Sequence, residues 1–410
     1  MFQLLYYLIF IPTLLYGLYF GLTGLFIFRE AKVKIGKHKP KNKIAILVAS
    51  RNEETVIGKL VDSLLKQNYP RSLYEVYVIP NNCTDNTDQA ARDAGASIIE
   101  CKHKVSSKGE VLKHVFDVLL KKDYDAFIVF DADNIVHPNF LSRMNDALCE
   151  GYEVAQGFRD SKNPNDNWIS GGYSLFYWGQ NIFFSKARMS MNGSASINGT
   201  GFMVKRTVLE QYGFNPSTMT EDIEFTAQCA LNGKQIVFVE DAITYDEQPF
   251  NFKVSWKQRK RWSIGTYQCL VKYSWKLFKA SIKKRSLACF DMSLFFLAPV
   301  CQVIGMVLLG ILLVYNWIGI RLNDLFAFMF AYRYVFFVLS YFLSVGIAIF
   351  VVKYNKKEVK NSLTGIMTFP FFLITWIPIN IVCLYTKKVK WDPIKHTRDI
   401  SIDNITTGKI

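Results

Sequence analysis

In the stretch DAFIVFDADNIV, residues 125–136, five apolar residues are followed directly by two carboxylates. A short, uninterrupted apolar run of this kind is typical of a strand that is buried on both faces of a sheet. The strand would deliver Asp131 and Asp133 to one loop, with a single alanine between them. Two carboxylates at this spacing raise one another's pKa unless a cation compensates, and oxygen ligands suit Mg²⁺ or Mn²⁺ bridging a diphosphate. A solvated turn also explains the pair, but its position after a strand favours a metal site.

Strand and helix patterns alternate in the residues before this stretch. The segment KIAILVAS, residues 43–50, predicts a strand, and the next segment has apolar residues on one helical face: Val56, Leu60, Leu64 and Leu65. A second strand is predicted at residues 74–80 and a second helix through Ala90 and Ala94. The alternation predicts an α/β fold with parallel strands, whose ligands bind beyond the carboxyl ends of the strands. The polar residues there are Arg51, Asn52, Glu53, Asn82 and Asp85. Neither a GxGxxG nor a Walker motif is present, so a different nucleotide site is needed.

Two later segments carry small or acidic residues that could meet a ligand. INGTGFMVKR, residues 197–206, predicts a glycine-rich turn that enters a strand, where Gly199 and Thr200 would let a ligand approach the backbone; an ordinary hairpin is the alternative. Further along, Thr220, Glu221 and Asp222 predict the start of a helix, with Thr220 as its N-cap. The two acids either favour the helix dipole or include a catalytic base.

The composition points to lipid as a partner. Hydrophobic residues make up 50% of the 410 residues, and no charge occurs between Leu4 and Phe28, a stretch long enough to cross a bilayer. Three more apolar segments follow the central region, at residues 287–320, 325–352 and 363–386. The net charge of +15 would permit nucleic-acid binding, but the apolar segments favour a membrane surface instead. Seven basic residues between Arg29 and Lys43 assign the block that follows to the cytosol by the positive-inside rule.

These features divide the chain into four parts. We expect an N-terminal membrane helix in residues 1–28, a cytosolic domain in 29–284, a membrane region in 285–386 and a basic tail in 387–410. The lysines after residue 352 and those of the tail both indicate the cytoplasmic side, yet one apolar segment separates them. We therefore expect that this segment, which contains Pro370 and Pro378, is re-entrant or interfacial. The eight cysteines show no CxxC spacing, in keeping with a reducing compartment.

A basic and aromatic segment, SWKQRKRWSIGTY at residues 255–267, completes an ordered set of motifs. The set resembles that of the membrane-embedded processive glycosyltransferases of family 2, and it consists of Asp85, Asp131 with Asp133, Thr220-Glu221-Asp222, and Gln258 to Trp262. Cellulose, hyaluronan and mixed-linkage β-glucan synthases belong to that family. The resemblance covers residues 43–263 and implies an α/β catalytic domain of the GT-A type, interface helices and a channel of transmembrane helices. The aromatic segment Tyr173 to Met189 is expected to be one of the interface helices, with an internal core helix as the alternative.

The resemblance also implies roles for individual residues. Asp222, with Glu221 beside it, would be the general base, and Asp131 and Asp133 would hold Mg²⁺ or Mn²⁺. The UDP-sugar donor would be bound by Arg51, Glu53, Asp85, Lys108, Asp131 and Arg261, and the acceptor by Gly199, Thr200, Gln258 and Trp262. The tail segment at residues 388–401 resembles a gating segment through Trp391, His396, Thr397 and Arg398, and a tail that binds headgroups is the alternative.

The resemblance implies a multi-pass enzyme of the cell membrane, with its catalytic domain in the cytosol. It would be a processive inverting β-glycosyltransferase that polymerises sugar from a UDP-sugar, preferably UDP-glucose, into a cellulose-like or mixed-linkage 1,3;1,4 β-glucan. Tyr332, Arg333, Tyr334 and Tyr341 are the candidate channel residues for the growing polysaccharide. The alternatives are a non-processive transferase that acts on a membrane lipid and a synthase that uses UDP-N-acetylglucosamine. A non-enzymatic scaffold gives no reason for three aspartates in this order, and nucleic acid is not an expected partner.

Overall fold

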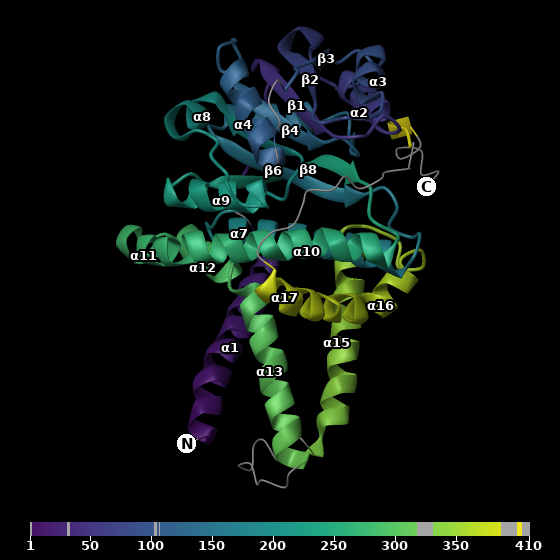
Figure 1. The fold of residues 1–410 in the computed structure, drawn as a ribbon. Coiled ribbons are helices and arrows are strands. Elements are labelled where there is room, and N and C mark those ends of the chain that lie inside the picture. Colours follow the sequence, from purple (N-terminus) through teal and green to yellow (C-terminus); the bar gives the residue numbers. More distant parts are fainter. Residues whose placement is uncertain are drawn as a thin grey trace.

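The structure is a computed structural model, and it describes residues 2–30, 33–101, 105, 107–317, 331–386 and 400–403. Figure 1 shows three layers: an α/β domain, a layer of helices beneath it, and long helices that run away from both. The start of α1 (Phe2–Gly24) lies at the far end of the long helices, whereas residues 400–403 lie beside the α/β domain (Figure 1).

One mixed sheet of eight strands, in the order β3-β2-β1-β4-β7-β6-β8-β5, forms the centre of the α/β domain. The predicted parallel arrangement is confirmed for β1 with β2 and β4, but β7 is antiparallel to β4 and β6, so the sheet is mixed. The strands are β1 (Ile44–Ser50), β2 (Tyr74–Pro80), β3 (Ser97–Ile98), β4 (Ala126–Asp131), β5 (Ile135–Val136), β6 (Val154–Ser161), β7 (Phe202–Lys205) and β8 (Ile236–Asp246).

Apolar helix faces cover both sides of this sheet. The predicted helical face after β1 is confirmed, because Val56, Leu60 and Leu64 are all buried in the core. β4 itself is buried from Ala126 to Phe130, as its apolar run requires. The helices of the domain are α2 (Ile57–Leu65), α3 (Thr87–Asp93), α4 (Lys108–Leu119), α5 (Phe140–Cys149), α8 (Arg206–Tyr212) and α9 (Glu221–Leu231).

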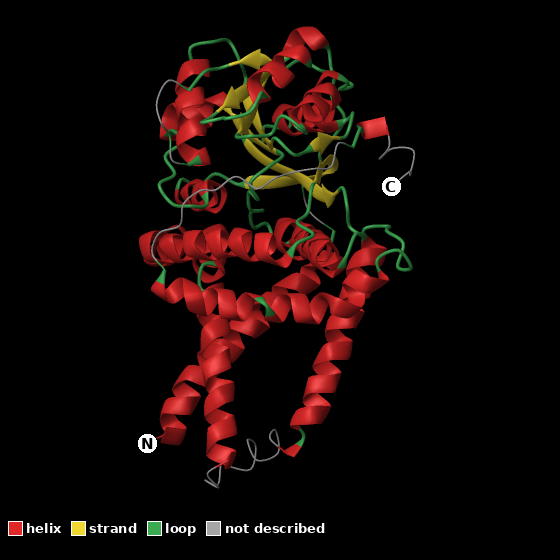
Figure 2. Ribbon diagram, turned by 45° about the vertical axis from the view of Figure 1, so that its right-hand side comes forward, coloured by secondary structure: helices red, strands yellow, loops and turns green. Residues whose placement is uncertain are grey.

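The helices of the middle layer lie across the base of the α/β domain (Figures 1 and 2). They are α6 (Trp168–Gly179), which continues through a π-helical turn (Gln180–Lys186) into α7 (Ala187–Ser190); α10 (Phe252–Cys269), which continues through a second π-helical turn (Leu270–Ser274) into α11 (Trp275–Lys284); α12 (Leu287–Phe295); α16 (Leu363–Ile374); and α17 (Trp376–Tyr385). α6 is an internal helix rather than a surface one, because Tyr173 and Trp178 are buried. Gly171 and Gly172 let it pack closely on α16, since a Cβ at Gly172 would lie 2.5 Å from the ring of Phe372.

The long apolar helices are α1 (Phe2–Gly24), α13 (Ala298–Trp317) and α15 (Arg333–Tyr354), and they point away from the middle layer (Figure 1). Among the described residues, three helices are long and apolar enough to cross a membrane, and a fourth candidate is the pair α12 and α13, bent by 49°. The third of those helices, Leu363–Tyr385, consists of α16 and α17, which run across the middle layer beneath α10 (Figure 1). The re-entrant or interfacial placement of this segment in a membrane stays a prediction.

The described end of the tail contacts the α/β domain. Ile402 is buried, and the carboxylate of Asp403 lies 3.6 Å from the ammonium group of Lys66, which follows α2. Residues 400–403 therefore lie on the same side of the middle layer as the sheet, and the cytoplasmic location of the tail stays a prediction. The predicted gating residues 391–398 lie outside the described residues.

Candidate active site

The predicted catalytic residues meet at the carboxyl edge of β4. Asp131 ends that strand, Asp222 lies in the first turn of α9, and Gly199 lies between them in the turn before β7. A Cβ built on Gly199 would be 3.3 Å from Oδ2 of Asp222 and 4.0 Å from Oδ2 of Asp131. Gly199 has φ +91°, which residues other than glycine rarely adopt, so both this backbone conformation and the close approach of the Asp222 carboxylate favour glycine here.

Lys108 connects the acidic groups of this site. It is the first residue of α4, and its ammonium group forms an ion pair with Asp131, donates to the carbonyl oxygen of Gly199 at 2.7 Å and lies 3.6 Å from a carboxylate oxygen of Glu221. Burial lowers the pKa of Lys108, but the charges of Asp131 and Glu221 outweigh it and the net shift is upward. The structure therefore brings Lys108, Asp131 and Glu221 together, and a protonated lysine lies where a diphosphate would need positive charge.

Asp222 has the electrostatic environment of a general base. Burial and the neighbouring charge of Glu221 raise the pKa of Asp222 to about 7, against the opposing effects of the Ile223 amide and Lys108. A carboxylate with a pKa near neutrality accepts a proton far more readily than one with the ordinary value of 3.8, yet is still deprotonated in part at pH 7. The Asp131 carboxylate behaves in the opposite way, because Lys108 and Arg159 overcome its burial and lower its pKa.

Two site residues, Arg159 and Asp246, were not found from the sequence. Arg159 in β6 forms an ion pair with Asp246 at the end of β8, donates to the carbonyl oxygen of Asn198 at 2.6 Å and stacks 3.9 Å over the ring of Tyr177. Burial, together with the nearby charge of Asp133, raises the pKa of Asp246 to about 7 in spite of Arg159. In the sequence, each of these residues is a charged residue at an apolar strand pattern. Many strands have such a residue, so the pattern alone did not mark Arg159 or Asp246 as part of a site.

The other half of the metal pair, Asp133, is buried next to this ion pair. Asn134 links the two parts, since its amide donates to Asp246 at 3.2 Å and its oxygen accepts from the hydroxyl group of Thr200. Thr200 is fully buried, and its hydroxyl group also accepts from the backbone N–H of Asp131 at 3.1 Å. Thr200 thus holds the loop that carries Asp131 and Asp133 through hydrogen bonds. The predicted contact of Thr200 with an acceptor stays a prediction.

α10 is fixed to α9, the helix that carries Asp222, by a close contact. A Cβ on Gly265 would lie 2.3 Å from Oγ1 of Thr220, so only glycine lets α10 approach the start of α9 this closely. The side chain of Gln268 adds a hydrogen bond from the Met219 amide at 2.8 Å. The predicted N-cap position of Thr220 is confirmed, but its side chain makes no capping hydrogen bond and packs against α10 instead.

This contact brings the basic and aromatic motif of α10 to the site. Arg261 is close enough to Asp131 to lower the pKa of that carboxyl. The Trp262 ring lies within an aromatic cluster, with centroids 5.9 Å from Tyr173, 6.2 Å from Tyr177 and 6.2 Å from Trp376, the last stacked. Trp262 and Arg261 therefore lie on the membrane-helix side of the site. Gln258, one turn earlier in α10, is partly buried.

The fully buried cation of α10 is Arg259, which sequence reasoning did not single out. Its guanidinium donates to the hydroxyl group of Thr375 at 2.6 Å and lies 4.7 Å from the ring of Phe372 and 5.4 Å from that of Trp376. Arg259 therefore joins α10 to the connection between α16 and α17. In the sequence, Arg259 is one of four cationic residues between positions 257 and 261. Their spacing alone did not show which of the four side chains is buried.

The remaining donor-site candidates lie beyond β1 and β2. The carboxylate of Asp85 accepts from the backbone N–H and hydroxyl group of Thr87, at 3.2 and 2.6 Å, and from the backbone N–H of Glu54 at 3.2 Å. The Glu53 N–H donates to the same threonine at 2.9 Å. Arg51 follows β1 directly. These contacts hold the two strand ends together beside β4, and their part in nucleotide binding stays a prediction.

Asp131 and Asp133 are the candidate ligands for a divalent metal ion. The described residues contain no group of three or more His, Cys, Asp or Glu side chains placed to hold a metal by themselves. Asp131 and Asp133 nevertheless offer hard carboxylate oxygens from one loop, which suits an ion that takes its remaining ligands from a diphosphate and water. The residues present thus fit a metal that arrives with the nucleotide.

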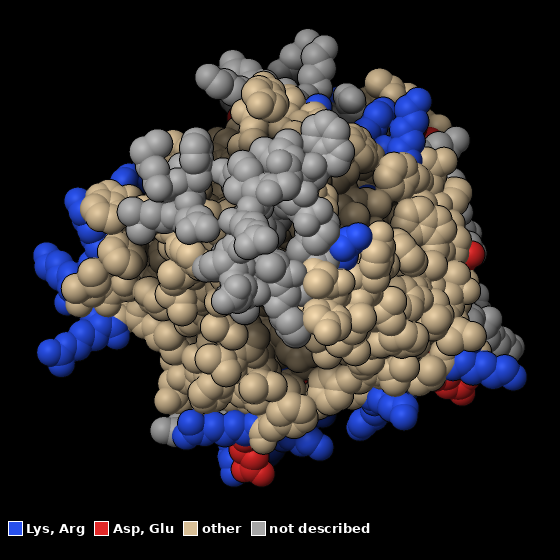
Figure 3. All heavy atoms as spheres, turned by 90° about the horizontal axis from the view of Figure 1, so that it is seen from below, with Lys and Arg blue, Asp and Glu red and all other residues tan. Residues whose placement is uncertain are grey.

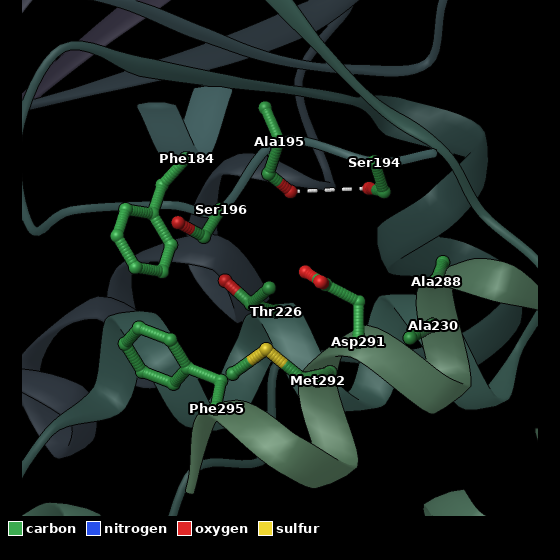
Figure 4. A pocket seen from close by; sticks show the side chains of 10 residues that line it. All are labelled: Phe184, Ser194, Ala195, Ser196, Thr226, Ala230, Ala288, Asp291, Met292 and Phe295. Carbon is green, nitrogen blue, oxygen red and sulfur yellow. Dashed lines mark hydrogen bonds between the residues drawn. The ribbon is translucent and has the colours of Figure 1, made fainter. Parts of the chain in front are cut away.

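A separate pocket lies behind α9 (Figure 4). Thr226 of α9 and Asp291 of α12 line it together with the loop at Ser194 and Ser196. The Thr226 hydroxyl group donates to the carbonyl oxygen of Asp222 at 3.0 Å and accepts from the Ile197 N–H at 3.0 Å. The pocket is therefore bordered by Thr226, which holds the backbone of Asp222, and the Asp222 side chain is not among its lining residues.

Comparisons with known proteins agree with this geometry. The family described as "Glycosyltransferase like family 2" matches residues 40–265. A relative from Bacillus subtilis, the probable glycosyltransferase YdaM, is 24% identical over 374 residues, which are 85% of this chain and 86% of the relative. A β-monoglucosyldiacylglycerol synthase from Nostoc is 28% identical over 57% of this chain and 51% of its own length, so the match spans about half of that relative.

A poly-β-1,6-N-acetyl-D-glucosamine synthase from Staphylococcus epidermidis is 22% identical over 63% of each chain. Among solved structures, the mannosyltransferase PcManGT from Pyrobaculum calidifontis, in complex with GDP-Man and Mn²⁺, is similar with a TM-score of 0.62 and 16% identity, over 93% of this chain and 99% of that one. At this identity the similarity concerns the fold, which is of the GT-A type. The chain therefore belongs to glycosyltransferase family 2, and it is a transferase that takes its sugar from a nucleotide sugar.

Proposed function

We propose that this protein transfers a sugar, with inversion, from a UDP-sugar to a hydroxyl group of a membrane lipid, without forming a polymer. The observation that carries the proposal is the convergence at Gly199 of the Asp222 and Asp131 carboxylates, whose oxygens would lie 3.3 and 4.0 Å from a Cβ built there. An acceptor hydroxyl group beside Asp222 would face a sugar whose diphosphate lies beside Asp131 and Lys108. An inverting transfer would need the two substrates in line in this way.

The transfer follows from the charges of these groups. The acceptor oxygen forms a bond to the anomeric carbon while Asp222 takes its proton, and the bond from that carbon to the diphosphate oxygen breaks. Lys108 and Arg261 lie beside Asp131 and would offset the negative charge of the departing UDP. A Mg²⁺ or Mn²⁺ ion held by Asp131 and Asp133 would add Lewis-acid stabilisation of the same leaving group. Attack from the opposite face turns an α-linked donor into a β-linked product.

The arrangement of the long helices favours a lipid as the acceptor. Every residue from 331 to 340, at the start of α15, is exposed, including the candidate channel residues Tyr332 and Tyr334. α13 and α15 leave the middle layer at separate places and approach each other toward their far ends (Figures 1 and 2). A lipid headgroup could reach the middle layer sideways, and the Nostoc relative carries the name of a lipid glucosyltransferase.

A processive polymerase is the second candidate, because of the aromatic cluster around Trp262. Sugar faces stack on aromatic rings, and Trp262, Tyr173, Tyr177 and Trp376 form such a group at the acceptor end of the site. The Staphylococcus relative is named as a polymer synthase. The expected β-glucan product and gating tail belong to this second candidate. A multi-pass membrane location with a cytosolic catalytic domain is proposed for both candidates.

Product analysis distinguishes the two candidates. Isolated membranes that contain the protein are incubated with radiolabelled UDP-glucose or UDP-N-acetylglucosamine, with Mn²⁺ or Mg²⁺, and the label is separated into solvent-extractable lipid and ethanol-insoluble material. Lipid label that is absent from the variant Asp222→Asn supports the lipid transferase. Label in insoluble material that a lichenase or cellulase digests supports the polymerase and refutes the lipid proposal. Equal label with wild type and variant contradicts the role of Asp222 in both.

A further inference from the structure

We propose that α11, with the π-helical turn before it, binds anionic lipid headgroups at the membrane surface. This interaction surface is separate from the active site and consists of an apolar strip and a lysine strip on one helix. The inference goes beyond the proposed transfer reaction, and it rests on the membrane location of the long helices and not on the identity of the acceptor.

One face of this helix is used for folding. Tyr273, Leu277 and Ser281 are buried at a spacing of four positions, and this face of the helix packs against α9 and α12. Side chains at this spacing share one helix face. The helix is therefore held in place by the protein core, and its other two faces are free to serve a partner.

The second face is apolar and exposed. Val271, Trp275, Phe278 and Ile282 are 88%, 63%, 37% and 67% exposed, and their spacing of four, three and four residues places them on one strip. The rings of Trp275 and Phe278 stack with centroids 5.7 Å apart. Four large apolar side chains in one exposed strip are costly in water and mark a surface that is covered in use.

The third face carries lysines at the same spacing. They are Lys272, Lys276, Lys279 and Lys283, and all four are exposed. Lys272 pairs with Glu224 at 2.8 Å and Lys279 lies 5.1 Å from the Trp275 ring, whereas no hydrogen bond or ion pair joins Lys276 or Lys283 to another described residue. No acidic residue occurs between 270 and 290, so the whole strip is cationic.

The position of α11 identifies the partner as a lipid surface. α11 lies at the end of the middle layer, on the side from which α1 and α13 leave the molecule (Figures 1 and 2). Seen from the far end of these helices, the face is mostly uncharged and Lys and Arg side chains gather at its edge, also on the side where α11 lies (Figure 3). A helix with an apolar strip beside a lysine strip lies in the interface of a bilayer and prefers anionic headgroups.

The test uses the full chain in nanodiscs made of phosphatidylcholine, with or without phosphatidylglycerol, and measures amide hydrogen exchange. We expect phosphatidylglycerol to slow exchange in residues 270–285, by up to about five-fold for each lysine at the surface. The double variant Lys276→Glu with Lys283→Glu should lose this difference. The matched control, Lys113→Glu with Lys121→Glu, changes two exposed lysines in and just after α4 of the α/β domain, outside the middle layer, and should keep it.

A second variant tests the apolar strip. Trp275→Ala with Ile282→Ala should speed exchange of the same residues in both kinds of nanodisc, while exchange in β1 and β4 reports that the fold is intact. Equal exchange of the wild type in both lipids would overturn the proposal, and so would a phosphatidylglycerol response that persists in the lysine variant. Protection that depends on protein concentration would assign the strip to a second copy of the chain instead. No substrate is used, so failure here is distinct from failure of the proposed transferase reaction.

Discussion

Neutralising Glu221 should move the pH dependence of the transferase without removing its base. The pKa of Asp222 is raised to about 7 by burial first and by the charge of Glu221 second. Glu221 also lies 3.6 Å from Lys108, so the variant Glu221→Gln removes a like charge and leaves the lysine to act on Asp222. Burial remains, and we expect the pKa of Asp222 to fall by about one pH unit, which corresponds to about 1.4 kcal/mol.

The direction of the change in the pH–rate profile follows from the proposed role of Asp222 as the base. Only deprotonated Asp222 can accept the proton, so the rate of the wild type should rise with pH and level off above about pH 7. In Glu221→Gln the rise should occur at lower pH, so the variant would retain a larger share of its maximal rate at pH 6 than the wild type does. The assay is kcat/KM for labelled UDP-sugar between pH 5 and 9, at about constant ionic strength. Glu210→Gln, which changes an exposed carboxylate of α8, is the control.

Two results would refute this reasoning. A rise at unchanged or higher pH in Glu221→Gln would mean that Glu221 does not raise the pKa of the group that limits the rate. A pH profile of the same shape in the residual activity of Asp222→Asn would mean that the titrating group is another one, with Asp246 as the next candidate because its pKa is also raised to about 7.

Three further predictions concern the same site and its support. Gly199→Ala should cost about 1–2 kcal/mol through its positive φ and should nearly abolish activity, because the Cβ enters the space beside Asp222; Gly233→Ala has a similar φ of +70° with nothing within 4 Å, and its activity should stay near wild type. Glu224→Gln should lower the free energy of unfolding at pH 7 by about 1–3 kcal/mol, measured by chemical denaturation in detergent. Burial raises the pKa of Glu224, but hydrogen bonds from Lys272 and Tyr273 lower it more, so this stabilisation is present above the unfolded pKa and is lost as the pH falls through the lowered value. Chelation of divalent metals should stop the reaction and added Mn²⁺ should restore it, whereas activity that survives chelation would contradict the metal role of Asp131 and Asp133.

Much of the candidate site could be predicted because its residues follow recognisable local patterns. Asp131 and Asp133 follow a buried strand, and Glu221 and Asp222 begin a helix, as their sequences indicated. Arg159 and Asp246 could not be found in this way. Each becomes a site residue only because β6 and β8 lie side by side, which brings together two residues 87 positions apart in the chain.

The amino-acid sequence by itself determined the strands and helices around the site, the apolar helices and the order of the motifs, because apolar periodicity and turn residues act over a few positions. Only the tertiary structure decided which face of each helix meets which neighbour. Three contacts between distant segments show this: Gly265 packs against Thr220, α6 packs closely against α16, and the buried Arg259 donates to Thr375. The same contacts leave one strip of α11 apolar and exposed, since burial of Leu277 turns Trp275 outward.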